Sequence, residues 1–144
     1  MVGGAAVELY TNGAYVSGDL DFVGSPSEAL ERALKEAGFE RAGRHWLLSA
    51  KRVFVEFPST EIGSQQTVEL QVGELRLCVL APEDLIIDRL AGFQFWQSEV
   101  DFENAVLLFR HLRDEIDRKR LARAARSAGV SESVRRLLDS VEAT

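Results

Sequence analysis

The sequence predicts an α+β protein in which a small mixed β-sheet and packing helices are followed by a helical C-terminal region. From about residue 15 to residue 80 the apolar residues mostly alternate with polar ones, and from Pro82 onward they follow helical spacing. The chain has 144 residues, the usual length of one domain. We therefore expect a single domain over 1–144, with a mixed α/β part that holds the site over 1–80 and a helical part over 81–144.

The first clear helix start lies at Ser25-Pro26-Ser27-Glu28. We take Ser25 as the N-cap, Pro26 as the first helical residue and Glu28 as the partner in a capping box. The helix should end before Gly38, since glycine commonly follows the last turn of a helix.

Short extended segments follow this helix. They alternate apolar and polar residues, and the last two flank the turn pair Gly73-Glu74 as in a β-hairpin. The expected strands cover residues 39–41, 45–49, 53–57, 68–72 and 75–79.

The second half begins a helix at Pro82-Glu83-Asp84, where acidic residues stand at the end favoured by the helix dipole. Two or three further helices are expected after it. The mixed-charge stretch 110–126 is most often a solvated helix face, and its alternative is a basic patch for an RNA acceptor.

Composition excludes several classes of protein. The net charge of −6, from 17 basic and 23 acidic residues, argues against a protein that binds duplex DNA, whose phosphates are met by clustered Lys and Arg. Cys78 is the only cysteine, so neither an intramolecular disulfide nor a cysteine metal cluster can form. A reducing cytoplasm fits best, and no apolar run is long enough to suggest a membrane partner.

Asp19-Leu20-Asp21 places two carboxylates on one face of an expected strand, because successive side chains point to opposite faces. Two like charges about 4 Å apart repel by roughly 4 kcal/mol at an effective dielectric constant of about 20. Solvent exposure, a raised carboxylate pKa or a bound divalent cation would each make the pair tolerable.

A third carboxylate lies in the apolar strand over residues 53–57. Glu56 there needs a partner, which the sequence offers either as Arg44 or Arg52 or, if the two strands are neighbours, as Asp19 and Asp21. Three such carboxylates suit Mg²⁺, which prefers a few oxygen ligands, retained waters and phosphates.

The ordered set of motifs resembles the DNA polymerase beta-type nucleotidyltransferase superfamily. The set consists of Gly3-Gly4, a helix-length spacer, Ser17-Gly18-Asp19-Leu20-Asp21-Phe22 and a strand that bears Glu56. Within that superfamily the chain resembles minimal nucleotidyltransferases and AbiEii-type toxins, which also share "PEDLIIDRL" at 82–90, then Asp101 and Ala105. The resemblance covers residues 2 to about 112 and implies the family's small mixed sheet.

The resemblance also implies roles for individual residues. Asp19 and Asp21 would hold Mg²⁺ or Mn²⁺, Glu56 would be the third ligand or the base, and Gly3, Gly4 and Ser17 would bind the phosphates of a nucleoside triphosphate.

The reaction that the resemblance implies is transfer of a nucleoside monophosphate to a hydroxyl of an acceptor protein, a tRNA or a small molecule. The acceptor oxygen displaces pyrophosphate at the α-phosphorus. The alternative is an inactive nucleotidyltransferase-like module that binds a protein partner, as in a toxin-antitoxin pair.

Other interpretations stay open at this stage. The family's glycine pair normally ends a strand, and only Met1 and Val2 precede it here, so we expect the sequence to begin late in that strand; the pair could equally be a flexible terminus. His45 and Trp46 could serve as a base and a nucleobase platform, or as sheet surface and core. A third possibility for the whole chain is a purely structural acidic domain.

Overall fold

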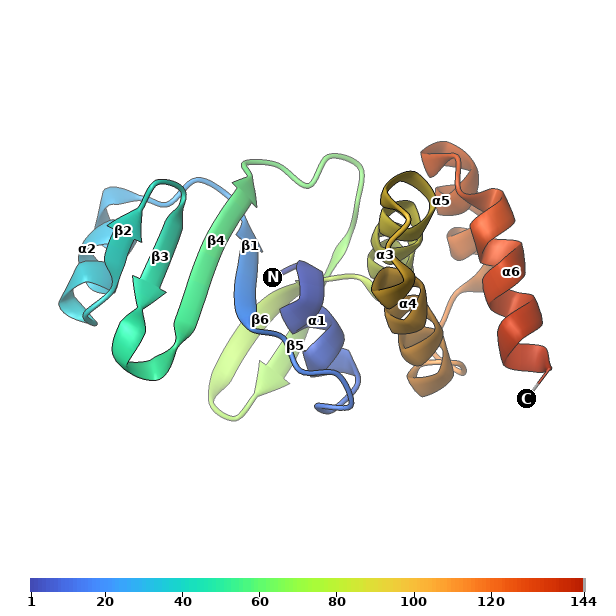
Figure 1. The fold of residues 1–144 in the computed structure, drawn as a ribbon, viewed down its shortest axis with the longest axis horizontal. Helices are drawn as coiled ribbons and strands as arrows, with labels where there is room; N and C mark the ends of the chain where they lie inside the picture. Colours follow the sequence, from blue (N-terminus) through green and yellow to red (C-terminus); the bar gives the residue numbers. More distant parts are fainter. Residues whose placement is uncertain (144) are drawn as a thin grey trace.

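The first half of the sequence contains a four-stranded mixed sheet, seen at the left of Figure 1. The computed structural model describes residues 1–143. β1 runs parallel to β4, whereas β3 is antiparallel to both β4 and β2, so the predicted mixed sheet is confirmed. Across the sheet the strands are β1 (Asp19–Val23), β4 (Val53–Ser59), β3 (His45–Leu48) and β2 (Glu40–Ala42).

A second sheet of two antiparallel strands follows in the chain. β5 (Thr67–Val72) and β6 (Leu75–Leu80) are joined at Gly73-Glu74, as the sequence predicted for this hairpin. A short 3₁₀ turn, η1 (Ser49–Lys51), connects β3 to β4.

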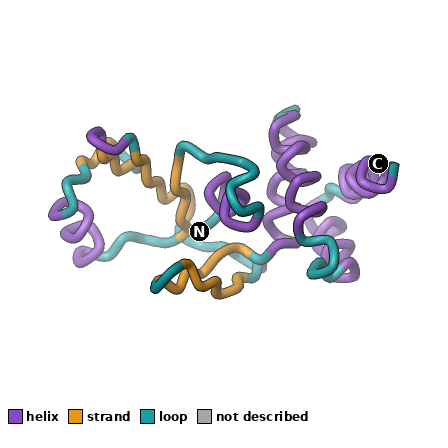
Figure 2. Tube along the Cα trace, turned by 90° about the horizontal axis from the view of Figure 1, so that it is seen from below, coloured by secondary structure: helices purple, strands orange, loops and turns teal. Residues whose placement is uncertain are grey.

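The first two residues of the chain link the two sheets. The Val2 N–H donates a hydrogen bond to the Asp21 carbonyl in β1 over 2.8 Å, and the Leu80 N–H of β6 donates to the Met1 carbonyl over 2.9 Å. The Met1 ammonium donates to the Cys78 carbonyl over 2.7 Å. A bridge between Val2 and Asp21 therefore precedes the glycine pair, in the place where the resemblance puts a strand. The N-terminus lies between the two groups of strands (Figure 2).

The two faces of the four-stranded sheet differ in polarity. On the apolar face the rings of Phe22 and Phe57 lie 6.2 Å apart, and Val55 and Trp46 are buried. The helix α2 (Glu28–Glu36) lies beside this apolar face, and its Leu34 lines a hollow together with Phe22 and Phe57. The opposite face carries the acidic residues.

Helices form the rest of the structure and share the main hydrophobic core with β6. The long helix α3 packs against α1, α4, α5 and α6 (Figure 1). No helix among residues 1–143 is long and apolar enough to cross a membrane. The helices are α1 (Gly3–Tyr10), α3 (Pro82–Trp96), α4 (Glu99–His111), α5 (Arg118–Ala128) and α6 (Ser131–Glu142).

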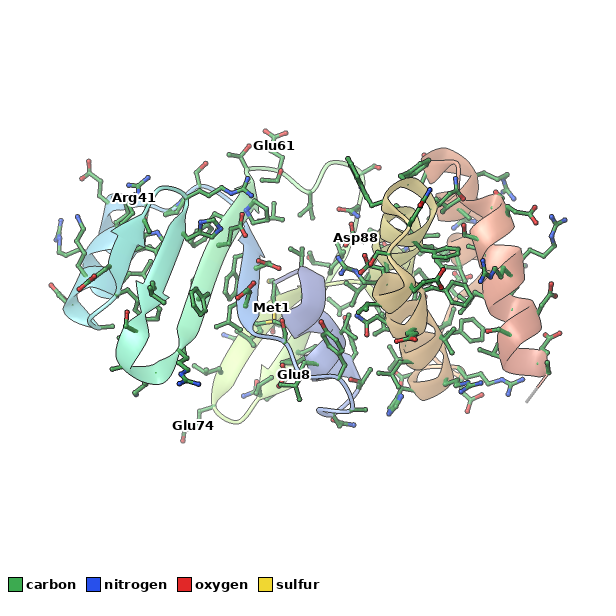
Figure 3. The ribbon with its side chains drawn as sticks, viewed as in Figure 1. Met1, Glu8, Arg41, Glu61, Glu74 and Asp88 are labelled. Atoms are coloured by element: carbon green, nitrogen blue, oxygen red, sulfur yellow. The ribbon has the colours of Figure 1, made fainter. Side chains whose placement is uncertain are left out.

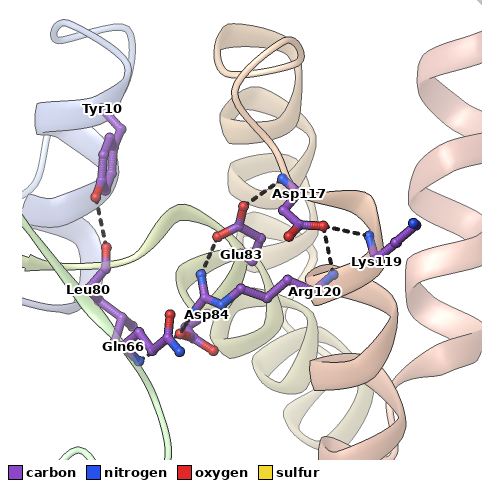
Figure 4. Close-up of polar contacts among 8 residues, drawn as sticks. All are labelled: Tyr10, Gln66, Leu80, Glu83, Asp84, Asp117, Lys119 and Arg120. Carbon is purple, nitrogen blue, oxygen red and sulfur yellow. Dashed lines mark hydrogen bonds and ion pairs between the residues drawn. The ribbon is translucent and has the colours of Figure 1, made fainter.

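The start of α3 is fastened to α5 by a buried ion network (Figure 4). Arg120 pairs with Glu83 and Asp84, whose side chains are only 6 % and 10 % exposed. Asp84 also accepts a hydrogen bond from the Gln66 N–H, and Glu83 accepts one from the Asp117 N–H, each over 2.8 Å. The expected solvated face over 110–126 is therefore wrong at Arg120, which is largely buried.

The N-cap of α2 is Ser27, not Ser25, and the helix begins at Glu28 instead of Pro26. The Ser27 hydroxyl accepts from the Leu30 N–H over 3.2 Å, so Glu28 stands at the first helical position and cannot form the predicted capping box. The end of the helix before Gly38 is confirmed.

The cap assignment gives a direct prediction. Ser27→Ala should lower the free energy of unfolding by about 1 kcal/mol, because one N–H of the first turn loses its acceptor. Ser25→Ala is the matched control and should leave stability unchanged in a urea titration. Equal losses for the two variants would contradict the cap.

Candidate functional site

Parallel pairing of β1 with β4 brings the predicted acids together. Asp21 stands opposite Glu56 in the register, and Asp19 stands opposite Phe54. The two strands are neighbours, which is the condition under which the sequence placed Glu56 near Asp19 and Asp21. We call Asp19, Asp21 and Glu56 the acidic row. His45 of β3 pairs with Glu56 on the side opposite β1, so a histidine follows the acidic row across the sheet.

The surroundings of Asp21 shift its pKa. Partial burial raises its pKa, and the neighbouring charges of Glu56 and Asp19 raise it further, while Arg89 and His45 act in the opposite direction. A raised pKa at Asp21 is one of the three ways in which the carboxylate pair could be tolerated, and solvent exposure of Asp19 is another. Asp19 is exposed at the edge of the row.

Glu56 is held by two residues at the start of β3. Its Oε1 lies 2.6 Å from the Nε of Arg44, and its Oε2 lies 3.2 Å from the Nε2 of His45. The Arg44 contact lacks hydrogen-bond geometry, so the buried Oε1 makes no hydrogen bond. Arg44, and not Arg52, is thus the cation beside Glu56, and Trp46 is core.

The glycine pair opens α1 directly against the acids. Gly3 is buried and has a φ of +66°, and a Cβ at this position would overlap the Asp21 Oδ2 and lie 3.2 Å from its Cγ. A Cβ on Gly4 would lie 2.7 Å from the hydroxyl of Ser17. The pair is part of a helix end packed on the site and not a flexible terminus.

Ser17 is fixed between α1 and β1. Its N–H donates to the Glu8 Oε2 over 2.8 Å, and its hydroxyl donates to the Asp19 carbonyl over 2.9 Å. The structure therefore gathers all six predicted site residues, Gly3, Gly4, Ser17, Asp19, Asp21 and Glu56, around the first turn of α1 and the β1–β4 pair.

The close approach of Gly3 to Asp21 can be tested by substitution. Gly3→Ala should destabilise the fold by more than Gly13→Ala, because both positions have positive φ but only at Gly3 would the new methyl group meet a side chain. The left-handed conformation alone costs roughly 1–2 kcal/mol for a residue with a Cβ. Urea titrations of both variants give the difference, and equal losses would contradict the close approach.

Sequence reasoning missed two residues of this site, Asp88 and Arg89 of α3. They line a cavity of about 470 Å³ together with Gly3, Asp21 and Glu56. In Figure 3 Asp88 lies on the side of α3 that faces α1 and Met1. The signal was present in "PEDLIIDRL", where this charged pair lies between the apolar residues Ile87 and Leu90.

A second hollow, of about 370 Å³, also has Glu56 in its lining. Phe54, Leu47 and Ala42 give it an apolar floor, while Asp19, His45 and Glu56 supply its polar wall. Glu56 is therefore shared by a polar cavity and a more apolar one, so groups bound in the two spaces would meet at the acidic row.

In the described residues 1–143, no group of three or more His, Cys, Asp or Glu side chains is arranged to hold a metal ion. Glu56 faces Arg44 and His45 in this arrangement. A metal centre made by Asp19, Asp21 and Glu56 stays a prediction.

Comparisons with protein-family models, curated proteins and solved structures find no match for this chain. The resemblance therefore depends on the motifs themselves and on where the fold places them.

Proposed function

We propose that the protein transfers a nucleoside monophosphate from a nucleoside triphosphate to the hydroxyl of an acceptor. The observation that carries this proposal is the meeting of Asp21 with Glu56 beside the Gly3 backbone, at the wall of a cavity that Arg89 also lines. Acidic side chains, an open helix N-terminus and a guanidinium are the groups that a metal-bound triphosphate needs.

The two spaces beside Glu56 support a two-substrate layout. The triphosphate would occupy the cavity lined by Gly3 and Arg89, and the acceptor hydroxyl would approach from the hollow floored by Phe54. The hydroxyl oxygen would form the new bond to the α-phosphorus as the bond to pyrophosphate breaks. A carboxylate of the acidic row would take the hydroxyl proton.

Mg²⁺ or Mn²⁺ fits the donor chemistry of Asp19 and Asp21. The pKa of Asp21 is raised by burial and then by the charges of Glu56 and Asp19, and a cation would relieve the repulsion among these charges. The ion would neutralise charge on the triphosphate when bound. Glu56 would become the third carboxylate ligand only after its Oε1 separates from Arg44. This oxygen makes no hydrogen bond, so no hydrogen bond would be lost when it moves to the metal.

A second function is favoured by one observation, the engagement of Glu56 by Arg44 and His45. If that engagement persists with nucleotide present, the domain would be an inactive nucleotidyltransferase-like module that acts by binding a partner, such as the antitoxin of a toxin-antitoxin pair.

Mass spectrometry tests the proposal. Candidate proteins, tRNAs and small hydroxyl compounds are incubated with the protein, each nucleoside triphosphate and Mg²⁺, and searched for the added mass of a nucleoside monophosphate. Chelation of the metal should abolish the product, whereas Asp114→Asn, which changes an exposed acid far along the sequence, should leave it unchanged. No transfer to any acceptor, with nucleotide binding intact, would favour the inactive module.

A further inference from the structure

Arg89 carries a positive charge from α3 toward the acidic row, and its side chain is only 20 % exposed. Two carboxylates share its guanidinium: Nη2 donates to the Asp88 Oδ2 over 2.6 Å and Nη1 donates to the Asp101 Oδ1 over 2.8 Å. Its Nε–H is buried and has no hydrogen-bond partner. The guanidinium is therefore fixed at its two terminal nitrogens.

Asp101 reaches Arg89 from the first turn of the neighbouring helix α4. Its backbone N–H is capped by the Ser98 hydroxyl over 3.3 Å, which fixes the position of the residue at the start of the helix. The side chain is 21 % exposed. A carboxylate from a second helix thus reaches the arginine across the α3–α4 interface.

Gly92 makes this approach sterically feasible. It lies inside α3, where glycine costs roughly 1 kcal/mol relative to alanine, and its φ is not positive, so the backbone conformation does not require glycine. A Cβ at this position would overlap the Asp101 Oδ2 and lie 2.9 Å from its Cγ. The space left by the missing side chain is occupied by the carboxylate of Asp101.

The ion pair with Asp101 tethers Arg89. Without this tether, Arg89 could pair with other carboxylates that line the same cavity. Asp21 and Glu56 line the same space, and an arginine that moved onto them would neutralise the acids proposed to meet the metal. Tethering by Asp101 keeps the cation separate from the acidic row, so that cation and acids can engage a metal-bound triphosphate at the same time.

We propose that Asp101, admitted by Gly92, is a positioning residue that holds the Arg89 guanidinium for the phosphates of the nucleotide. This inference rests on the proposed function for its ligand, but the placement of Arg89 can be measured without any nucleotide.

The decisive variant is Asp101→Asn, which keeps the size of the side chain and removes one of the two negative charges that hold Arg89, leaving only that of Asp88. In the free protein, the NMR signal of the Arg89 Nε–H should persist at neutral pH in the wild type and broaden through exchange with water in the variant. The dissociation constant for a non-hydrolysable nucleoside triphosphate with Mg²⁺ should rise about tenfold or more, as expected for loss of a charged hydrogen bond.

Two further variants complete the test. Gly92→Ala should reproduce the change in the Arg89 signal if it folds, and Glu103→Gln, an exposed acid on the same helix α4, should change neither readout. An Arg89 signal and a nucleotide affinity that are both unaltered in Asp101→Asn would overturn the positioning role while leaving the proposed function intact. If the wild type binds no nucleotide and Asp101→Asn still broadens the signal, the placement of Arg89 by Asp101 stands, whereas its role toward phosphates and the proposed function both fail.

Discussion

Asp21→Asn is expected to lower the rate of nucleotide transfer by orders of magnitude, while the melting temperature stays the same or rises. The substitution keeps the size of the side chain and the pairing of β1 but removes one negative ligand from the proposed metal site. Stability should not fall, because the charge of Asp21 is already opposed by burial and by Glu56 and Asp19. Transfer is measured as labelled nucleotide incorporated into the acceptor, and stability as a thermal melt without metal.

The pH dependence of this variant follows from the raised pKa of Asp21. The folded state retains a proton that the unfolded carboxyl loses near its ordinary pKa of 3.8, so the contribution of Asp21 to stability decreases as the pH rises above that value. The stability gain of Asp21→Asn over the wild type should be absent well below pH 3.8 and grow toward neutral pH.

Other outcomes for Asp21→Asn separate the interpretations. If the domain is an inactive module, the variant should still bind its partner. A large loss of metal-free stability would contradict both the enzyme and the module, because Asp21 would then be a paired structural acid whose partner is left without its counter-charge. Asp114→Asn serves again as the exposed-acid control.

Arg120→Met is expected to lower the free energy of unfolding by about 3–5 kcal/mol, the usual effect of removing one partner from a buried ion pair. Glu83 and Asp84 would both remain buried at the start of α3 without their counter-charge (Figure 4). Methionine retains much of the apolar length of arginine, so the loss reports the charge more than the packing. Urea titration at neutral pH gives the difference.

A matched control and a rescue sharpen the result. Arg135→Met removes the cation of an exposed pair with Glu132 and should change stability by no more than about 1 kcal/mol. Adding Glu83→Gln and Asp84→Asn to Arg120→Met should restore much of the loss, since neutral amides can still accept the hydrogen bonds of the Gln66 and Asp117 N–H groups. A deficit unchanged by these two substitutions would contradict the electrostatic explanation.

Local signals predicted most of the fold. The alternation in β3 to β6, the Gly73-Glu74 turn and the proline at the start of α3 each lie within a few residues of the structure that they specify. The start of α2 was misplaced because Ser25 and Ser27 flank Pro26 and both are good caps. Only the geometry of the chain around the first turn decides which hydroxyl reaches an N–H group.

The candidate site could be predicted in part, where carboxylates recur at the two-residue spacing of a strand. Strand alternation predicted that Asp19 and Asp21 share one face, and the pairing of β1 with β4 places Glu56 beside Asp21. Arg89 and its tether were not found, because the contact of Asp101 with Arg89 depends on how two helices pack and on the missing side chain of Gly92. The choice between Arg44 and Arg52 likewise depended on the register of His45 with Glu56.

The parallel pairing of β1 with β4 also has a kinetic consequence for the acidic row. Asp21 and Glu56 are brought together by closing a long loop that contains α2, β2 and β3, and this closure costs chain entropy before any contact between the two strands can offset it. The hairpin β5–β6 and the helices can form from contacts close in sequence. During refolding, far-ultraviolet circular dichroism should therefore recover no later than the environment of His45, because that environment is complete only when β1, β4 and β3 have assembled.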